Sequence, residues 1–89
     1  MIKKEEIWAV VVWYGPTEEQ SLYLCSYIHE VSHVVIVDNS ANDNSPLLAS
    51  LPQMNYTYLP QGENTGVATA LNIGCRYAIG HGASWILTM

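Results

Sequence analysis

The stretch VVIVDNSANDNS, residues 34–45, joins four consecutive β-branched residues to a segment that is polar except for one alanine. A short apolar run of β-branched residues predicts a strand buried on both faces, as in a parallel sheet. Asp, Asn and Ser are turn formers, so the segment that follows is expected to be a loop. The stretch therefore predicts a buried parallel strand with a polar loop at its carboxyl end.

The segments on either side repeat this alternation of strand and helix. IWAVVVW, residues 7–13, predicts a second buried strand, which the YGP sequence ends. Thr17 and Gln20 have the spacing of a capping box, and a helix is expected from there to about Val31. Ser45 and Pro46 suit the N-cap and first position of a short helix.

The second half continues in the same order. YTYL, residues 56–59, predicts a third strand, and SWILTM, residues 84–89, predicts the start of a fourth. Between them a helix is expected from about Gly66 to Ile79, with five residues on its apolar face: Val67, Ala70, Leu71, Gly74 and Ala78. Alternating strands and helices predict an α/β fold, a Rossmann-like open parallel sheet with helices on both faces.

Composition narrows the possible partners. The chain has 89 residues, 49% of them hydrophobic, which suits one small domain or part of a larger one. With three basic residues and a formal net charge of -5, it has no basic stripe for nucleic acid. The apolar runs are too short to span a bilayer, and Glu5 and Glu6 argue against a signal peptide. Cys25 and Cys75 are expected to be buried, reduced thiols of a cytosolic protein.

The sequence HEVSH, residues 29–33, has the H-E-x-x-H spacing of a zinc-protease helix. Two histidines four apart share a metal only if both lie on one continuous helix. His33 directly precedes the predicted strand, so the helix is expected to end before it. A coincidental match near a helix end is therefore the favoured interpretation, and a zinc protease is the third hypothesis.

Three polar segments follow the first three predicted strands: WYGP, DNSANDNS and QGENTG. In an open parallel sheet, ligands bind at the carboxyl ends of the strands. Asp38 can accept a hydrogen bond from a nucleobase or a ribose hydroxyl, and Tyr14 can stack on a base. The alternative is that Asp38 caps its own loop while neighbours such as Asn39 and Ser40 satisfy backbone groups.

Taken together, VVVWYGP, VVIVDNSANDN and ENTGVATALNIGCRYAIGHGASWILTM resemble the start of family 2 glycosyltransferases, closest to the bacterial rhamnosyltransferase-like branch. The resemblance implies the nucleotide-binding half of a GT-A fold. It implies nucleotide-binding roles for the residues that match the family motifs: Tyr14, Asp38, Asn39, Asn64 and Gly66, with Asn72 as a further candidate. Trp13 and Gly15 depart from the usual Thr and Asn of the family.

The resemblance also implies a reaction and its partners. The intact enzyme would transfer a sugar, such as rhamnose, from a dTDP- or UDP-linked donor to a glycan acceptor, with Mg or Mn on the diphosphate. Residues 1–89 are interpreted as the N-terminal part of the domain, because the family's acidic metal motif is expected just after Met89. The fragment is thus expected to hold no catalytic or metal-binding residue and to be inactive alone.

Further expectations concern location and association. The resemblance implies a cytoplasmic enzyme, with the inner face of the bacterial membrane as a site of peripheral association. A truncated domain is expected to expose an apolar edge near residues 84–89 and to self-associate. The second hypothesis is a small non-enzymatic α/β binding module, complete in itself.

Overall fold

A computed structural model describes residues 4–24, 30–50 and 55–88 of the chain. Its elements, in order, are η1 (Lys4–Glu6), β1 (Ile7–Trp13), α1 (Glu18–Tyr23), β2 (His33–Asp38), η4 (Ser45–Ser50), β3 (Tyr56–Pro60), α2 (Val67–Gly80) and β4 (Trp85–Thr88). The predicted alternation of strands and helices is confirmed over these ranges.

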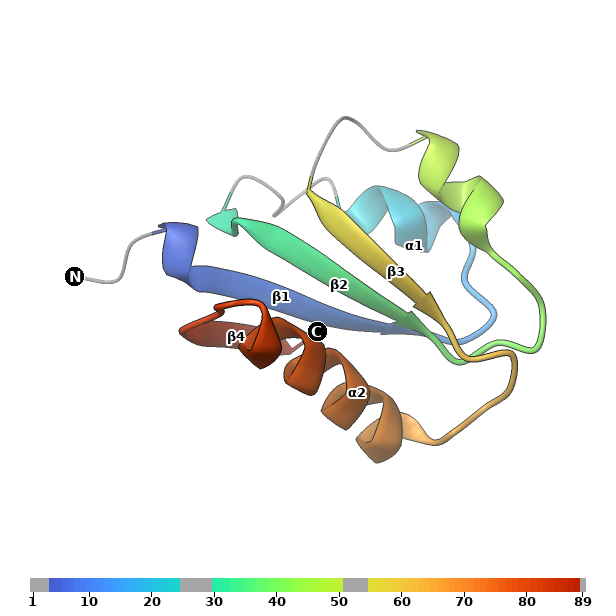
Figure 1. Ribbon diagram of the computed structural model, residues 1–89. Coiled ribbons are helices and arrows are strands. Elements are labelled where there is room, and N and C mark those ends of the chain that lie inside the picture. Colours follow the sequence, from blue (N-terminus) through green and yellow to red (C-terminus); the bar gives the residue numbers. More distant parts are fainter. Residues whose placement is uncertain (1–3, 25–29, 51–54, 89) are drawn as a thin grey trace.

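The four strands form one parallel sheet in the order β3-β2-β1-β4. The chain moves outward from β1 through β2 to β3, and α2 then returns it to the far side of β1 (Figure 1). α1 and η4 lie on one face of the sheet and α2 lies on the other. The predicted open parallel sheet with helices on both faces is therefore confirmed.

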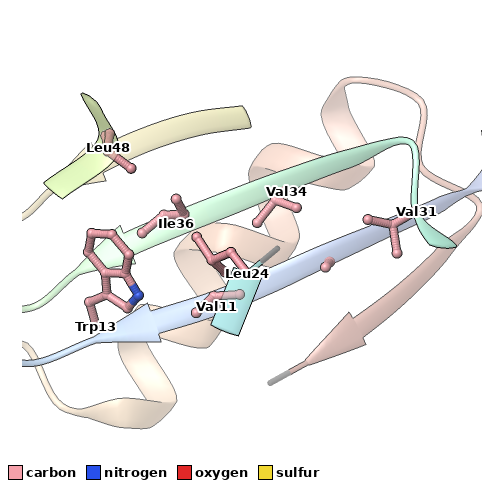
Figure 2. Close-up of a cluster of buried hydrophobic side chains, with 8 residues drawn as sticks. Val11, Trp13, Leu24, Val31, Val34, Ile36 and Leu48 are labelled. Atoms are coloured by element: carbon pink, nitrogen blue, oxygen red, sulfur yellow. The ribbon is translucent and has the colours of Figure 1, made fainter. Parts of the chain in front are cut away.

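Large side chains fill the layer between the sheet and α1. Figure 2 shows Trp13, Ile36 and Leu48 together at one end of this layer, with Leu24 of the α1 segment over Val11 and Val34. Alternate residues of β1 and β2 point to this side, as the two-residue period of a strand requires. Burial of these apolar groups is the main source of stability on this face.

Small side chains line the face of α2 that contacts the sheet. Ala70, Gly74 and Ala78 are buried there against Val10 and Val37. A Cβ placed on Gly74 would lie 2.4 Å from Cγ1 of Val10, so the helix approaches the sheet closely because this residue is glycine. The expected apolar face of the helix is confirmed except at Val67, the first residue of α2, which is 65% exposed.

The ends of the helices agree only partly with the sequence predictions. The capping box of α1 is present, with the Thr17 hydroxyl accepting from the Gln20 backbone N–H. The expected extension of this helix to Val31 is wrong, because that residue lies in a bend just before β2. There the backbone N–H of Ser32 donates to the Ile7 carbonyl at 2.8 Å, which draws the chain into the sheet. Cys25, also named in the sequence predictions, lies outside the described residues.

The ends of two other helices follow their sequence signals. η4 begins at Ser45, but it is a 3₁₀ helix rather than an α-helix. α2 begins at Val67 with Gly66 as its N-cap and ends at Gly80. After it, Gly82 adopts a positive φ of 99°, and the N–H of Ala83 donates to the Ala78 carbonyl. This is the Schellman motif that a glycine beyond a helix end predicts.

His33 is the first residue of β2, so the two histidines of HEVSH do not share one helix. Its Nε2 lies 2.8 Å from the Thr57 hydroxyl, and its ring centroid lies 4.3 Å from that of Trp8. His29 lies outside the described residues. The continuous helix that a zinc protease needs is therefore not formed at this motif.

The exposed surface includes the edge strand β4. Trp85 and Leu87 of this strand are about half exposed, which confirms the expected apolar edge near residues 84–89. Cys75 of α2 is a free, half-buried thiol. Among the described residues, no helix is long and apolar enough to span a membrane.

Candidate functional site

The loops that follow β1, β2 and β3 are joined by hydrogen bonds at the carboxyl edge of the sheet. The backbone N–H of Gly15 donates to the Ser40 hydroxyl at 2.7 Å, which joins the first loop to the second. The N–H of Gln61 donates to the Asp38 carbonyl at 2.9 Å, which joins the third loop to the end of β2. The three polar segments predicted from the sequence therefore form one continuous edge.

Asp38, the last residue of β2, is 1% exposed, and both of its carboxylate oxygens accept hydrogen bonds. Oδ1 accepts from the backbone N–H of Ser40 at 3.0 Å. Oδ2 accepts from the Asn44 side-chain amide at 2.8 Å and from the Tyr58 hydroxyl at 2.6 Å. A carboxylate has about four acceptor positions, so one remains for a further donor.

These donors decide the protonation state of the carboxyl group. Burial alone would raise the pKa of Asp38, but hydrogen bonds from Tyr58, Ser40 and Asn44 outweigh burial and lower it below its usual value. Burial and the bond to Asp38 raise the pKa of the Tyr58 hydroxyl. The network therefore holds a carboxylate beside a neutral phenol at neutral pH.

Asn39 makes the corresponding connections on the α2 side of the sheet. Its Oδ1 accepts from the Thr65 hydroxyl at 2.7 Å, and its Nδ2 donates to the Gly66 carbonyl at 3.2 Å. Its backbone N–H donates to the Trp13 carbonyl at 2.8 Å. With 2% of its surface exposed, Asn39 fixes the start of α2 against the ends of β1 and β2.

The loop before α2 contains the other two residues predicted from the N-x-G motif. The Asn64 side chain is exposed, and its Oδ1 accepts from the Gly66 backbone N–H at 2.9 Å. Gly66 has a φ of 89°, a conformation in which a residue with a Cβ would be strained. Both residues therefore shape the turn into the helix.

Tyr14 follows β1 and is 68% exposed, so its ring is available for stacking. The neighbouring Trp13 points into the core instead, with its ring centroid 6.4 Å from that of Tyr58. The large indole thus packs inside the sheet layer and leaves the edge open. Gly15 has a φ of 53°, a left-handed conformation that both Gly and the family's usual Asn adopt.

Asn72 is the one predicted site residue outside this arrangement. It lies within α2 and is exposed, and the hydrogen bonds that join the three loops do not include it. Its nucleotide-binding role stays a prediction.

A pocket of about 490 Å³ opens beside the Asp38 network, between the 41–45 loop and the end of β3. Its lining residues are Ala41, Asn42, Asp43, Ser45, Tyr58, Pro60 and Gly62. Asp43 at its rim accepts from the backbone and hydroxyl of Ser45, and these bonds lower its pKa. The pocket therefore combines an aromatic wall with a carboxylate.

A divalent cation was expected for the intact enzyme, and its usual ligands in proteins are clustered oxygen donors. Within residues 4–24, 30–50 and 55–88, no group of three or more His, Cys, Asp or Glu side chains is placed to hold a metal. The described residues do not themselves form a site for such an ion, and the cation of the intact enzyme stays a prediction.

Sequence reasoning missed two residues of this edge, Tyr58 and Thr65. Tyr58 was recognised only as part of an alternating strand, although its position two residues before the strand end directs it toward Asp38. Thr65 lies inside the N-x-G motif, between its two named residues. In both cases the partner lies more than 15 residues away in sequence, so local patterns carry no signal of the contact.

The parallel sheet and the joined polar loops at its carboxyl edge define an α/β protein with a candidate nucleotide site. The profile of the family described as "Glycosyl transferase family 2" matches residues 19–89. The chain therefore belongs to the family 2 glycosyl transferases, as its motifs predicted.

A particular relative is the dTDP-rhamnosyl transferase RfbF of Shigella flexneri, which is 36% identical to this chain over 83 residues. The match covers 91% of the chain and 27% of that protein. The chain thus spans about a quarter of the length of the curated relative it matches. No solved structure matches the chain with statistical significance.

Proposed function

We propose that this chain is the nucleotide-sugar-binding part of a glycosyltransferase that uses a dTDP-linked deoxysugar, such as rhamnose, and a glycan acceptor. Membership of the family supports the reaction class, and the named relative supports the donor. The observation that carries the proposal is the joined carboxyl edge, where the charged Asp38 lies one strand away from the exposed Tyr14.

The base would stack on Tyr14 and bring its imino N–H to Asp38. These side chains follow neighbouring strands, because Trp13 and Asp38 are register partners in β1 and β2. Asp38 has one acceptor position left, which a single imino donor would use. Asn39, Asn64 and Gly66 would hold the loop beside the sugar.

Calorimetric titration with dTDP and UDP tests the binding half of the proposal. We expect the chain to bind dTDP, and Tyr14→Ala to weaken binding about tenfold, because base–aromatic stacking contributes about 1–3 kcal/mol. Tyr56→Ala is the matched control, since Tyr56 is also exposed, at 39%, but begins β3 at the opposite end of the sheet. Equal weakening by both substitutions, or no binding of either nucleotide, would contradict the proposal.

The transfer half is tested in the full-length protein. We expect transfer of the sugar from dTDP-rhamnose to a glycan acceptor, and a lower donor affinity after Asp38→Ala. Unchanged donor affinity in that variant would remove Asp38 from the binding site. Failure of dTDP-rhamnose alongside successful transfer from another nucleotide sugar would correct the donor and leave the reaction class intact.

A further inference from the structure

Tyr58 lies at the centre of the hydrogen bonds that hold the loop after β2. Its hydroxyl donates to Oδ2 of Asp38 at 2.6 Å and accepts from the backbone N–H of Asn44 at 2.9 Å. It thus connects the first residue of the 38–45 loop with a residue close to its end. A second, longer contact of 3.2 Å joins the same hydroxyl to Oδ1 of Asp43.

The ring of Tyr58 is held independently of its hydroxyl. Tyr58 packs against the buried cluster on the α1 side of the sheet, next to Trp13. Its Cα pairs in register with Ile36, two residues before Asp38 in β2. Because strand and core fix the ring, the hydroxyl is presented at one place, and the loop forms around it.

We propose that Tyr58 is a positioning residue that fixes the charged carboxylate of Asp38 and the 38–45 loop in the conformation that receives the nucleoside. This role rests on the proposed nucleotide-binding function and adds to it a residue that does not itself touch the nucleotide. Three donors converge on Asp38, and among them only the phenol comes from outside the loop. Without that phenol, the carboxylate loses its hydrogen bond from β3, and the Asn44 N–H loses its acceptor.

The titratable groups that face Asp38 are Tyr58 of β3 and, through Tyr58, Asp43 of the loop. The hydrogen bond from Tyr58 is one of the causes that lower the pKa of Asp38. Its removal therefore raises that pKa toward the usual value. Nucleotide binding that needs the carboxylate should then be lost at a higher pH in the variant than in the original protein.

The test is Tyr58→Phe, which keeps the ring and removes only the hydroxyl. Tyr77→Phe is the matched control, because the Tyr77 hydroxyl is also hydrogen-bonded, accepting from the Thr57 hydroxyl, but lies on the α2 side toward the amino end of the sheet. We expect Tyr58→Phe to weaken dTDP binding about tenfold at neutral pH, as for a hydrogen bond to a charged group. We expect its acid limb of binding to move to higher pH, and Tyr77→Phe to change neither.

Amide NMR signals provide a readout that needs no nucleotide. Tyr58→Phe should shift the Ser40 and Asn44 amide resonances, since both N–H groups belong to the network around Asp38. If dTDP binds and Tyr58→Phe changes neither its affinity nor its acid limb, the positioning role is overturned and the proposed function stands. If dTDP does not bind the original protein, the proposed function fails, and unshifted amide signals would overturn the positioning of the loop as well.

Discussion

The two ends of β2 each carry a titratable side chain, and the two sites are built differently. Asp38 at the carboxyl end is surrounded by donors from a loop and from β3. His33 at the amino end lies against Trp8, with Thr57 as its hydrogen-bond partner. Burial, followed by the nearby His81, lowers the pKa of His33. The same direction of change favours the charge on Asp38 and the neutral form of His33.

This difference shows what distinguishes a candidate site from a structural contact in this fold. At the carboxyl edge, three hydrogen-bond donors stabilise the ionised form of the Asp38 carboxylate. At the amino end, His33 lies against Trp8, which also contacts the rings of Tyr77 and His81. Burial there favours the neutral imidazole. A residue such as Asp38, whose pKa is lowered by several hydrogen bonds that favour one charge state, is a candidate functional residue.

The largest expected effect on the free energy of unfolding comes from replacing Asp38 with alanine, in comparison with the same replacement at His33. Asp38→Ala removes three hydrogen bonds, those from the Ser40 N–H, the Asn44 amide and the Tyr58 hydroxyl, and should lower the free energy of unfolding by about 3 kcal/mol. His33→Ala removes one hydrogen bond and one ring contact, and should cost about 1 kcal/mol. Urea denaturation measures both, and equal losses would remove the distinction between the two ends.

Measuring stability at acid pH tests the role of Asp38 at the carboxyl end of β2. The folded pKa of Asp38 lies below its ordinary value of 3.8, so between these values the unfolded chain binds more protons than the folded one. The free energy of unfolding should therefore fall as the pH falls below about 4. Asp38→Asn should flatten this dependence more than Asp43→Asn, whose carboxylate is also held in its charged form but lies on the exposed rim. A larger effect at Asp43 would contradict the assignment.

Titration near neutral pH tests the amino end. The folded pKa of His33 lies below its ordinary value of 6.5, so protons bind the unfolded chain first as the pH falls. The free energy of unfolding should decrease from about pH 6.5 downward through the folded pKa. His33→Gln should remove part of this decrease, as followed by thermal unfolding across the pH range. If the pH dependence of the free energy of unfolding is unchanged in His33→Gln, a group other than His33 causes it.

An effect as small as that of His33→Ala is expected at Thr57, which links His33 to Tyr77. Thr57→Val removes a hydroxyl from between the two rings and should lower the free energy of unfolding by about 1 kcal/mol. Thr69→Val on the exposed side of α2 is the matched control, with an expected change within about 0.5 kcal/mol. Equal changes would mean that the hydrogen bonds of Thr57 contribute nothing measurable.

Local sequence patterns suffice to predict the order of the elements and the edge of the sheet where the candidate site lies. Runs of β-branched residues such as VVIV have few alternatives to a buried strand, and the capping box at Thr17 and the glycine beyond α2 mark helix ends through local geometry. Polar residues after each strand then had to meet, because parallel strands end at one edge. Family membership followed from the same motifs.

Tertiary structure alone decided which groups at that edge contact one another. Asp38 and Tyr58 are 20 residues apart, and only the register of β2 with β3 brings the hydroxyl to the carboxylate. Asn39 meets Thr65 because α2 returns to the opposite face of the sheet, which also required Gly74 for close packing. Local propensity carries no information about such pairs, since their proximity depends on strand order and on the distance between layers.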